Sequence, residues 1–211
     1  MSSILKVDEI QDTSGNLIIK EDSNTITVGA SGDTITIPSG ATLDGSNATL
    51  TGIASTNGIT MVDEFRLTSG FSGNANPITN NVERVDSNGQ GQFGTGMTES
   101  SGTYTFPTTG YYLVIFNTEH YLNGYDREIN GRIRVTTNNS SYSDVARGAG
   151  FIRASSANTH VGTTCMAVID VTDTSNVKVQ FRITVDNTNT NTVADTNTNT
   201  TSMLFMRLGD T

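Results

Sequence analysis

The chain offers few residues that could carry out acid–base or nucleophilic catalysis. His120 and His160 are its only histidines, and neither has a neighbouring nucleophile or the spacing of a zinc-binding HExxH motif. No GxSxG motif and no phosphate-binding P-loop occur in the sequence either. His120 follows Glu119 in a segment with strand character, so we expect a histidine at the surface or at a contact between chains.

The single cysteine is a poor candidate for a nucleophile. Cys165 lies in the segment Thr164–Ile169, which is apolar and has strand character. Because reactive cysteines lie beside cations or helix N-termini, we expect a buried and inert thiol here. A lone cysteine also excludes a disulfide within the chain.

The signals for metal and phosphate binding are weak. Asp170, Asp173 and Asp186 come nearest to an oxygen cluster for calcium, but they lack EF-hand spacing. No helical pattern follows the segment Gly89–Gly94, which favours a hairpin turn over a phosphate loop. The sequence therefore predicts no metal, no cofactor and no enzyme activity. Paired carboxylates for glycoside cleavage stay open, because the strand register decides their separation.

The charge of the chain argues against several classes of partner. Its 12 Lys and Arg and 21 Asp and Glu give a net charge of −9, whereas phosphate binding requires clustered basic side chains. With three lysines there is no polybasic membrane patch, and no apolar run approaches the ~20 residues of a membrane span. We expect no nucleic-acid partner and no membrane insertion. The first residues lack a signal-peptide pattern, so we expect folding in a cytosol.

The composition favours an all-β protein. Hydrophobic residues make up 34% of the 211 positions, whereas Thr, Asn, Ser and the 21 Gly are abundant. These residues suit strands and turns, and the long runs of Ala, Leu, Glu and Lys that mark helices are absent. The low apolar content also favours a protein that buries surface between chains.

The composition divides the chain into three regions, residues 1–23, 24–60 and 61–211. In the first, two apolar–polar stretches flank the turn residues Asp12–Asn16, which predicts a short hairpin. Such a hairpin cannot be stable alone, so we expect it to complete itself against sister chains or a partner surface. Its candidate docking residues are Ile4, Leu5, Val7 and Ile10.

The second region holds a small internal repeat. Thr25–Gly32 and Thr34–Gly40 each combine β-branched residues with a Gly/Ser turn, and weaker echoes continue to Gly52. One such unit cannot bury its apolar side, but stacked copies from parallel chains can, which predicts a short trimeric β-shaft. A flexible Gly/Ser linker is the alternative. The candidate trimerisation residues of the shaft are Ile26, Val28, Ile35 and Ile37.

The third region reads as a series of strands without helical periodicity, which predicts a β-sandwich or jelly roll. The expected strands are Glu64–Leu67, Val82–Val85, Gly102–Phe106, Tyr111–Leu122, Glu128–Thr136, Gly150–Ala154, Thr163–Val171, Val177–Val185 and Ser202–Leu208.

One stretch of this region points to a particular architecture. Gly102–Pro107 is an alternating aromatic strand, and after a Pro/Gly corner Gly110–Phe116 continues as an apolar strand. Together with Phe65–Leu67, Asp173–Gln180 and Thr201–Leu208, this pattern resembles the C1q/TNF-like jelly roll. The resemblance covers residues 60–211 and implies a homotrimer. We expect core or trimer packing from Tyr104, Phe106, Tyr111, Tyr112, Phe116 and Phe205.

Three loops of this region are candidates for facing a ligand, namely Asn123–Arg127, Asn138–Tyr142 and Thr188–Asn199. The last belongs to an unusual Asn–Thr alternation, which suits an ordinary exposed loop or a tip rich in groups that bind sugars. The candidate ligand-facing positions are Asn123, Tyr125, Asn138, Tyr142, Asn191 and Asn197.

The opening segment Met1–Asp12 is similar to the start of virion structural proteins of marine bacteriophages, notably cyanophages. This resemblance implies assembly in a bacterial cytoplasm, a place on the virion surface, and capsid or tail proteins as partners. Combined with the repeat and the jelly roll, it predicts a homotrimeric fibre. Its C-terminal knob, the jelly roll of residues 61–211, would adhere to the host, with a surface glycan as candidate ligand. A capsid decoration or cement protein without receptor binding is the alternative. A secreted lectin of the same fold is disfavoured by the missing signal peptide and disulfides.

Overall fold

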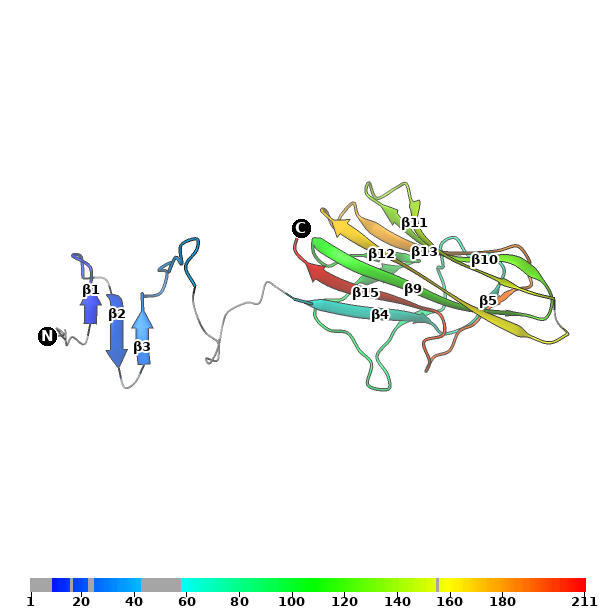
Figure 1. The fold of residues 1–211 in the computed structure, drawn as a ribbon, viewed down its shortest axis with the longest axis horizontal. Helices are drawn as coiled ribbons and strands as arrows, with labels where there is room; N and C mark the ends of the chain where they lie inside the picture. The colour runs from blue at the N-terminus through cyan, green and yellow to red at the C-terminus, as the bar shows by residue number, and fades with distance from the viewer. Residues whose placement is uncertain (1–8, 16, 23–24, 43–57, 155) are drawn as a thin grey trace. The chain divides into compact units, whose positions relative to one another are not determined.

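A computed structural model describes residues 9–15, 17–22, 25–42, 58–154 and 156–211 of the chain. Every regular element in these ranges is a β-strand, so the predicted all-β class is confirmed (Figure 1). No helix in the described ranges is long and apolar enough to cross a membrane. The chain divides into two compact units, Met1–Ile53 and Ala54–Thr211.

The first unit is a three-stranded antiparallel sheet in the order β1-β2-β3. Strands β1 (Glu9–Gln11) and β2 (Leu17–Asp22) form the predicted hairpin. Strand β3 (Thr25–Val28), which the sequence assigned to the first shaft repeat, pairs with β2. Residues 34–40, the second repeat, form no strand in the single chain.

The second unit is a sandwich of two antiparallel sheets. The five-stranded sheet has the order β11-β10-β13-β8-β7, and the seven-stranded sheet runs β5-β14-β9-β15-β4-β6 with β12 also paired to β9. The five-stranded sheet consists of β7 (Thr98–Ser100), β8 (Thr103–Thr105), β10 (Asp126–Thr136), β11 (Ser143–Ile152) and β13 (Lys178–Val185). The seven-stranded sheet consists of β4 (Met61–Leu67), β5 (Phe71–Ser72), β6 (Val82–Arg84), β9 (Gly110–Leu122), β12 (Thr159–Val171), β14 (Asn191–Thr192) and β15 (Ser202–Gly209).

Each of the nine strands expected in this unit overlaps an observed strand, and eight of them do so over most of their length. The predicted strand Gly150–Ala154 overlaps only the end of β11, which begins at Ser143. The short strands β5, β7 and β14 were not expected, because two or three residues give no periodic signal.

The aromatic stretch folds around two turns. Ser101 and Gly102, both at positive φ (50° and 79°), link β7 to β8 as the two-residue hairpin turn that such angles favour. A Cβ on Gly102 would lie 2.3 Å from the Ile78 carbonyl oxygen, so the turn requires glycine. In the corner before β9, the Tyr112 hydroxyl donates to the Thr108 carbonyl oxygen at 2.9 Å. This bond fixes the direction in which β9 leaves the corner.

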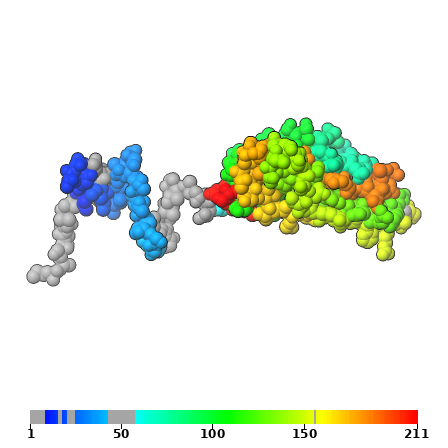
Figure 2. All heavy atoms as spheres, turned by 90° about the horizontal axis from the view of Figure 1, so that it is seen from above, coloured from blue at the N-terminus to red at the C-terminus, as the bar shows by residue number. Residues whose placement is uncertain are grey.

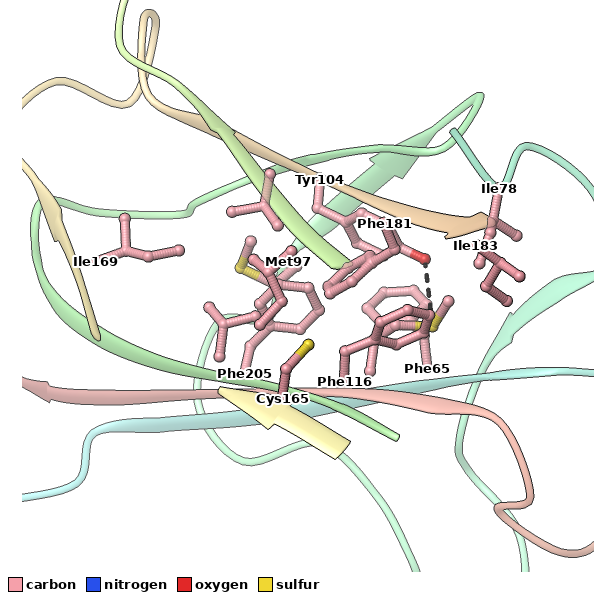
Figure 3. Packing of buried hydrophobic residues seen from close by; sticks show 14 of the residues in the cluster. Phe65, Ile78, Met97, Tyr104, Phe116, Cys165, Ile169, Phe181, Ile183 and Phe205 are labelled. Atoms are coloured by element: carbon pink, nitrogen blue, oxygen red, sulfur yellow. Dashed lines mark hydrogen bonds between the residues drawn. The ribbon is translucent and has the colours of Figure 1, made fainter. Parts of the chain in front are cut away.

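The core between the two sheets is built around packed aromatic rings (Figure 3). The Tyr104 ring packs edge-on against both Phe65 and Phe181, with centroid distances of 5.2 Å. Its hydroxyl contacts the Met203 sulfur at 3.9 Å, the dashed line in Figure 3. Phe205 lies 5.8 Å from Phe181, which joins strands of opposite sheets. Edge-on aromatic pairs add stability beyond the area they bury.

Truncation of a central ring tests this core. Phe181→Ala should lower the free energy of unfolding by about 3–5 kcal/mol, because it removes a ring that contacts both sheets. The matched control is Phe151→Ala on β11, whose ring is 58% exposed and should change stability by less than about 0.5 kcal/mol. Urea titration of the full chain, at the same protein concentration for both variants, measures the two changes in free energy of unfolding. Equal losses for the two variants would contradict the core described here.

Candidate functional site: the loop end and an uncovered sheet face

The end of the sandwich where β9 finishes carries two of the loops expected to face a ligand. The chain enters the unit near Thr60, whose hydroxyl accepts a bond from Arg207 on the last strand. The last strand ends against the beginning of β9, where Gly209 pairs with Tyr111. Because β9 is 13 residues long, its far end at Leu122 lies about 40 Å away. In Figure 1 the β9–β10 turn lies at the end of the unit opposite the C-terminus.

Two of the three predicted loops meet at this far end. They form a shallow, open depression of about 520 Å³ lined by Tyr125, Arg127, Asp186, Asn187 and Thr188. The Arg127 guanidinium pairs with the Asp186 carboxylate at 2.8 Å, and Tyr125 is 54% exposed. An exposed ring beside amide and charged groups can stack on and hydrogen-bond a polar ligand. Asp186 is the one carboxylate among these lining residues.

A buried carboxylate fixes the shape of this depression. Asp126 is 1% exposed and accepts hydrogen bonds from the backbone N–H groups of Glu128, Asp186 and Asn187. The Thr190 hydroxyl donates to it as well. One side chain therefore holds both loops, and hydrogen bonds to a carboxylate are stronger than bonds to a neutral acceptor. Asp126 lies within the predicted loop Asn123–Arg127, but no signal in the sequence indicates that its carboxylate is buried and joins two loops.

The other predicted ligand-facing positions do not join this cluster. Asn138 and Tyr142 lie in the β10–β11 turn at the opposite end, where Asn139 donates to the Asn176 carbonyl oxygen at 3.0 Å. Asn191 belongs to β14 and accepts a bond from Ser72 at 2.9 Å. The exposed Asn197 lies in the turn before β15, whereas Asn123 is exposed in the β9–β10 turn. Figure 2 shows, in yellow, the chain near the start of β12 projecting at one end of the unit.

The expectation that His120 lies at the surface or between chains is wrong. His120 is fully buried and shares hydrogen bonds with Thr118 at 2.9 Å and with Thr192 at 3.2 Å. Because side chains alternate along β9, His120 lies on the same inward face as Tyr112. The histidine thus ties β14, and with it the Asn–Thr segment, to the sheet.

The remaining groups considered for chemistry have structural surroundings. Burial raises the pKa of the Cys165 thiol, despite hydrogen bonds from the Gly148 and Ile133 backbone, as expected of an inert cysteine. Asp173 accepts bonds from Ser175 and Asn176 within its own turn. Among the described residues, no group of three or more His, Cys, Asp or Glu side chains could hold a metal ion.

The outward face of the seven-stranded sheet carries an apolar surface that the single chain leaves partly uncovered. Strand register places Val168, Leu113 and Met206 side by side in one row, and Met166, Ile115 and Leu204 in the next. Met166 and Val168 are 60% and 62% exposed. We call this surface the apolar face; its residues are Val62, Leu113, Ile115, Met166, Val168, Leu204 and Met206.

A polar row borders the apolar face toward the loop end. Asn117 is the register partner of both Thr164 and Ser202, and Thr164 donates to it at 2.8 Å. At the margin, burial raises the pKa of Glu64, although bonds from Ser202, the charge of Arg66 and a bond from Asn199 act in the opposite direction. The apolar face is therefore a bounded patch on one part of the sheet.

The predicted packing and docking residues divide into three groups. Five of the core candidates are buried, whereas Tyr111 is 41% exposed and lies in the row beyond Leu113. The buried five are Tyr104, Phe106, Tyr112, Phe116 and Phe205. In the first unit, the exposed candidates are Ile10 (40%), Ile26 (69%), Val28 (49%), Ile35 (59%) and Ile37 (47%). Ile4, Leu5 and Val7 lie outside the described residues.

Comparisons with known proteins identify the fold. No protein-family model matches the chain, and no curated protein matches its sequence. Among solved structures, it is similar to Eiger TNF from S. frugiperda, with a TM-score of 0.54 at 12% identity over 74% of this chain and 96% of that one. It is also similar to murine APRIL crystallised at pH 5.0, with a TM-score of 0.50 at 11% identity over 70% and 98%. The predicted TNF-like jelly roll is thereby confirmed.

Acid should weaken the attachment of β14 through His120. Burial lowers the pKa of His120 from 6.5 to about 4, an effect that the Asp126 charge partly offsets. Between these two pH values the unfolded chain binds a proton that the folded chain does not. The free energy of unfolding should therefore fall as the pH drops from 6.5 to about 4, by up to about 3 kcal/mol.

The His120→Gln variant should lose this part of the pH dependence in urea titrations between pH 7.5 and 4. His160→Gln, which removes the exposed histidine, is the matched control and should keep it. If the free energy of unfolding fell with pH in the same way for wild type and His120→Gln, the buried histidine would be ruled out as the cause.

Proposed function

We propose that this chain is a homotrimeric fibre or spike protein of a bacteriophage virion. Its N-terminal unit docks on the particle, and its jelly-roll knob adheres to the host surface, with a glycan as the candidate ligand. The similarity of residues 1–12 to phage virion proteins and the TNF-like fold of the second unit support this assignment. No step of the proposed function requires catalysis.

The single observation that carries the proposal is the apolar face. Seven apolar side chains lie in adjacent rows across β4, β15, β9 and β12, and the single chain leaves them partly in water. A contiguous apolar surface of this kind on a soluble chain marks an interaction site. We assign it to further copies of the same chain, because the resemblance to C1q/TNF-like domains implies a trimer and the seven side chains of the face are all uncharged. Glu64, the register partner of Leu204, lies at its edge.

The first unit is consistent with assembly from three chains. Its four shaft candidates are exposed in the single chain, with Ile26 at 69% and Ile35 at 59%. A small sheet needs a packed hydrophobic face for independent stability, and these β-branched side chains are uncovered in the single chain. Sister chains or a virion surface would cover these side chains, and the knob would hold the three chains in register.

The depression at the loop end supports adhesion. It lies at the end of β9 that is far from the entry of the chain at Thr60, so an attached knob would present it outward. The exposed Tyr125 ring and the polar groups of Asp186 and Asn187 suit a sugar. Three copies on one trimer would raise the avidity for a repetitive glycan even where each contact is weak.

A charge in the apolar face should break the trimer. Val168→Asp places a carboxylate within a surface that sister chains would desolvate, so sedimentation velocity should give one chain of 22.4 kDa instead of three. Val145→Asp on β11 makes the same change at a valine that is 51% exposed on the other sheet, and it should remain trimeric. Equal masses for the two variants would contradict the assignment of this face.

Removal of the knob from the virus tests the adhesive role. Phage particles that carry a shortened protein, from a gene without the codons for residues 58–211, should assemble and stay intact. They should adsorb to host cells at least tenfold more slowly. The measurements are the adsorption rate and the survival of particles under heat. Fragile particles with unchanged adsorption would instead favour the cement function.

A further inference from the structure

The outward face of the five-stranded sheet concentrates positive charge on an acidic protein. Nine of the chain's 12 basic residues are arginines, and besides Arg127 at the start of β10, four of them lie on adjacent strands of this sheet. Arg132 and Arg134 lie on β10, Arg147 on β11 and Arg182 on β13. We call these four residues the arginine face. It lies on the other sheet of the sandwich from the apolar face.

Strand register places three of these arginines in one row. Arg132 is directly opposite Arg147 on one side and directly opposite Arg182 on the other. Like charges in directly opposed positions destabilise an antiparallel sheet. Since neighbouring strands are about 4.8 Å apart, the three backbone positions from which these arginine side chains extend lie within about 10 Å of one another. Such a row costs stability unless an anion compensates for it.

The protein's own carboxylates compensate for it only in part. Asp144 accepts bonds from Arg132 at 2.6 Å and Arg134 at 3.2 Å, and lies 3.8 Å from Arg182. Glu128 pairs with Arg147. Four guanidinium groups thus face two carboxylates, which leaves a formal excess of two positive charges. The pKa of Asp144 is lowered: burial would raise it, but the bond from Arg132 and the charges of Arg132, Arg182 and Arg134 outweigh that effect.

Two of the arginines also keep unused hydrogen-bond donors. The Nε atoms of Arg132 and Arg182 are buried and have no hydrogen-bond partner in the described part of the chain. Arg134, in contrast, donates to Asp144, to Asn76 at 2.7 Å and to the Tyr142 carbonyl oxygen. A buried donor without a partner is uncommon and costs free energy. The unused donors belong to the two neighbouring arginines at the centre and one side of the row.

We propose that the arginine face binds the carboxylate or sulfate groups of an acidic polysaccharide. The guanidinium fork matches the geometry of these oxyanions and can donate two parallel bonds to one group. Arg182, whose side chain is 31% exposed and makes only the long contact to Asp144, supplies the donors. Arg132, Arg134 and Arg147 pair with the local carboxylates Asp144 and Glu128 and keep the face positive. This inference does not depend on the virion role, because it rests only on the second unit.

The size and surroundings of the face favour an acidic glycan over nucleic acid. The excess charge is confined to a row of about 10 Å, whereas duplex binding needs phosphate contacts along a longer track. The net charge of −9 repels a long polyanion from the rest of the chain. Phe151, which alternation places on the same side of β11 as Arg147, is 58% exposed and offers an aromatic surface to a sugar ring. If the apolar face is covered by sister chains, the arginine face stays free on the other sheet.

Binding of defined polymers tests this proposal with the full chain. The probes are dextran sulfate, polygalacturonate and uncharged dextran of similar length, measured by biolayer interferometry at 150 mM salt. We expect one or both acidic polymers to bind and dextran not to bind; the stronger acidic probe tells sulfate from carboxylate recognition. Arg182→Gln should weaken binding at least tenfold, and Arg182→Lys, which keeps the charge but loses the fork, by a smaller factor.

The matched control is Arg153→Gln, which removes the same charge from an exposed side chain just beyond the end of β11 and should change affinity less than twofold. Arg182 makes only a long ion pair, so its variants should keep the thermal midpoint of the wild type. Three results would overturn the proposal: no binding to either acidic polymer, equal losses for Arg153→Gln and Arg182→Gln, or tighter binding to a DNA duplex. Because these assays use no virus or host cell, their result is separate from that of the adsorption experiment.

Discussion

Over residues 111–116, strand β9 is apolar on both of its faces, and this property connects the core of the knob to its proposed assembly. Its inward residues Tyr112, Val114 and Phe116 are fully buried between the sheets. Its outward residues Leu113 and Ile115 lie at the centre of the apolar face. A strand that packs on one side only would alternate apolar and polar residues. This part of β9 therefore calls for a second layer that the described residues of the second unit do not supply, and we attribute that layer to sister chains.

The loop end depends on buried polar groups. Asp126 collects four donors from two loops, and His120 links β9 to β14 through a pair of threonines. Buried polar groups that are fully bonded stiffen their surroundings and select one arrangement of them. A depression held in this way binds with a smaller loss of conformational entropy than a mobile loop would. The Asn–Thr segment is thus partly built into the sheet, through β14, although its composition is that of a loop.

The sequence predicted the fold better than it predicted the site. Period-two patterns located long strands such as β9 and β13, but β11 was misplaced because Ser143–Gly150 is rich in small and charged residues. His120 could have been assigned correctly, since it has the same parity along β9 as Tyr112 and Phe116. The apolar face and the arginine row could not be derived, because both depend on the register between strands that are distant in sequence. The role of Asp126 depends in the same way on two loops that meet only in the folded chain.

The two outward faces of the sandwich differ in chemistry, one apolar and one rich in arginine, and this difference suggests a division of labour between assembly and binding. The most direct test of the account is the mass of the wild-type chain in solution, measured by multi-angle light scattering over a range of micromolar concentrations. We predict a particle of three chains of 22.4 kDa each throughout that range. A particle of one chain would leave the apolar face without its proposed partner and would contradict the account.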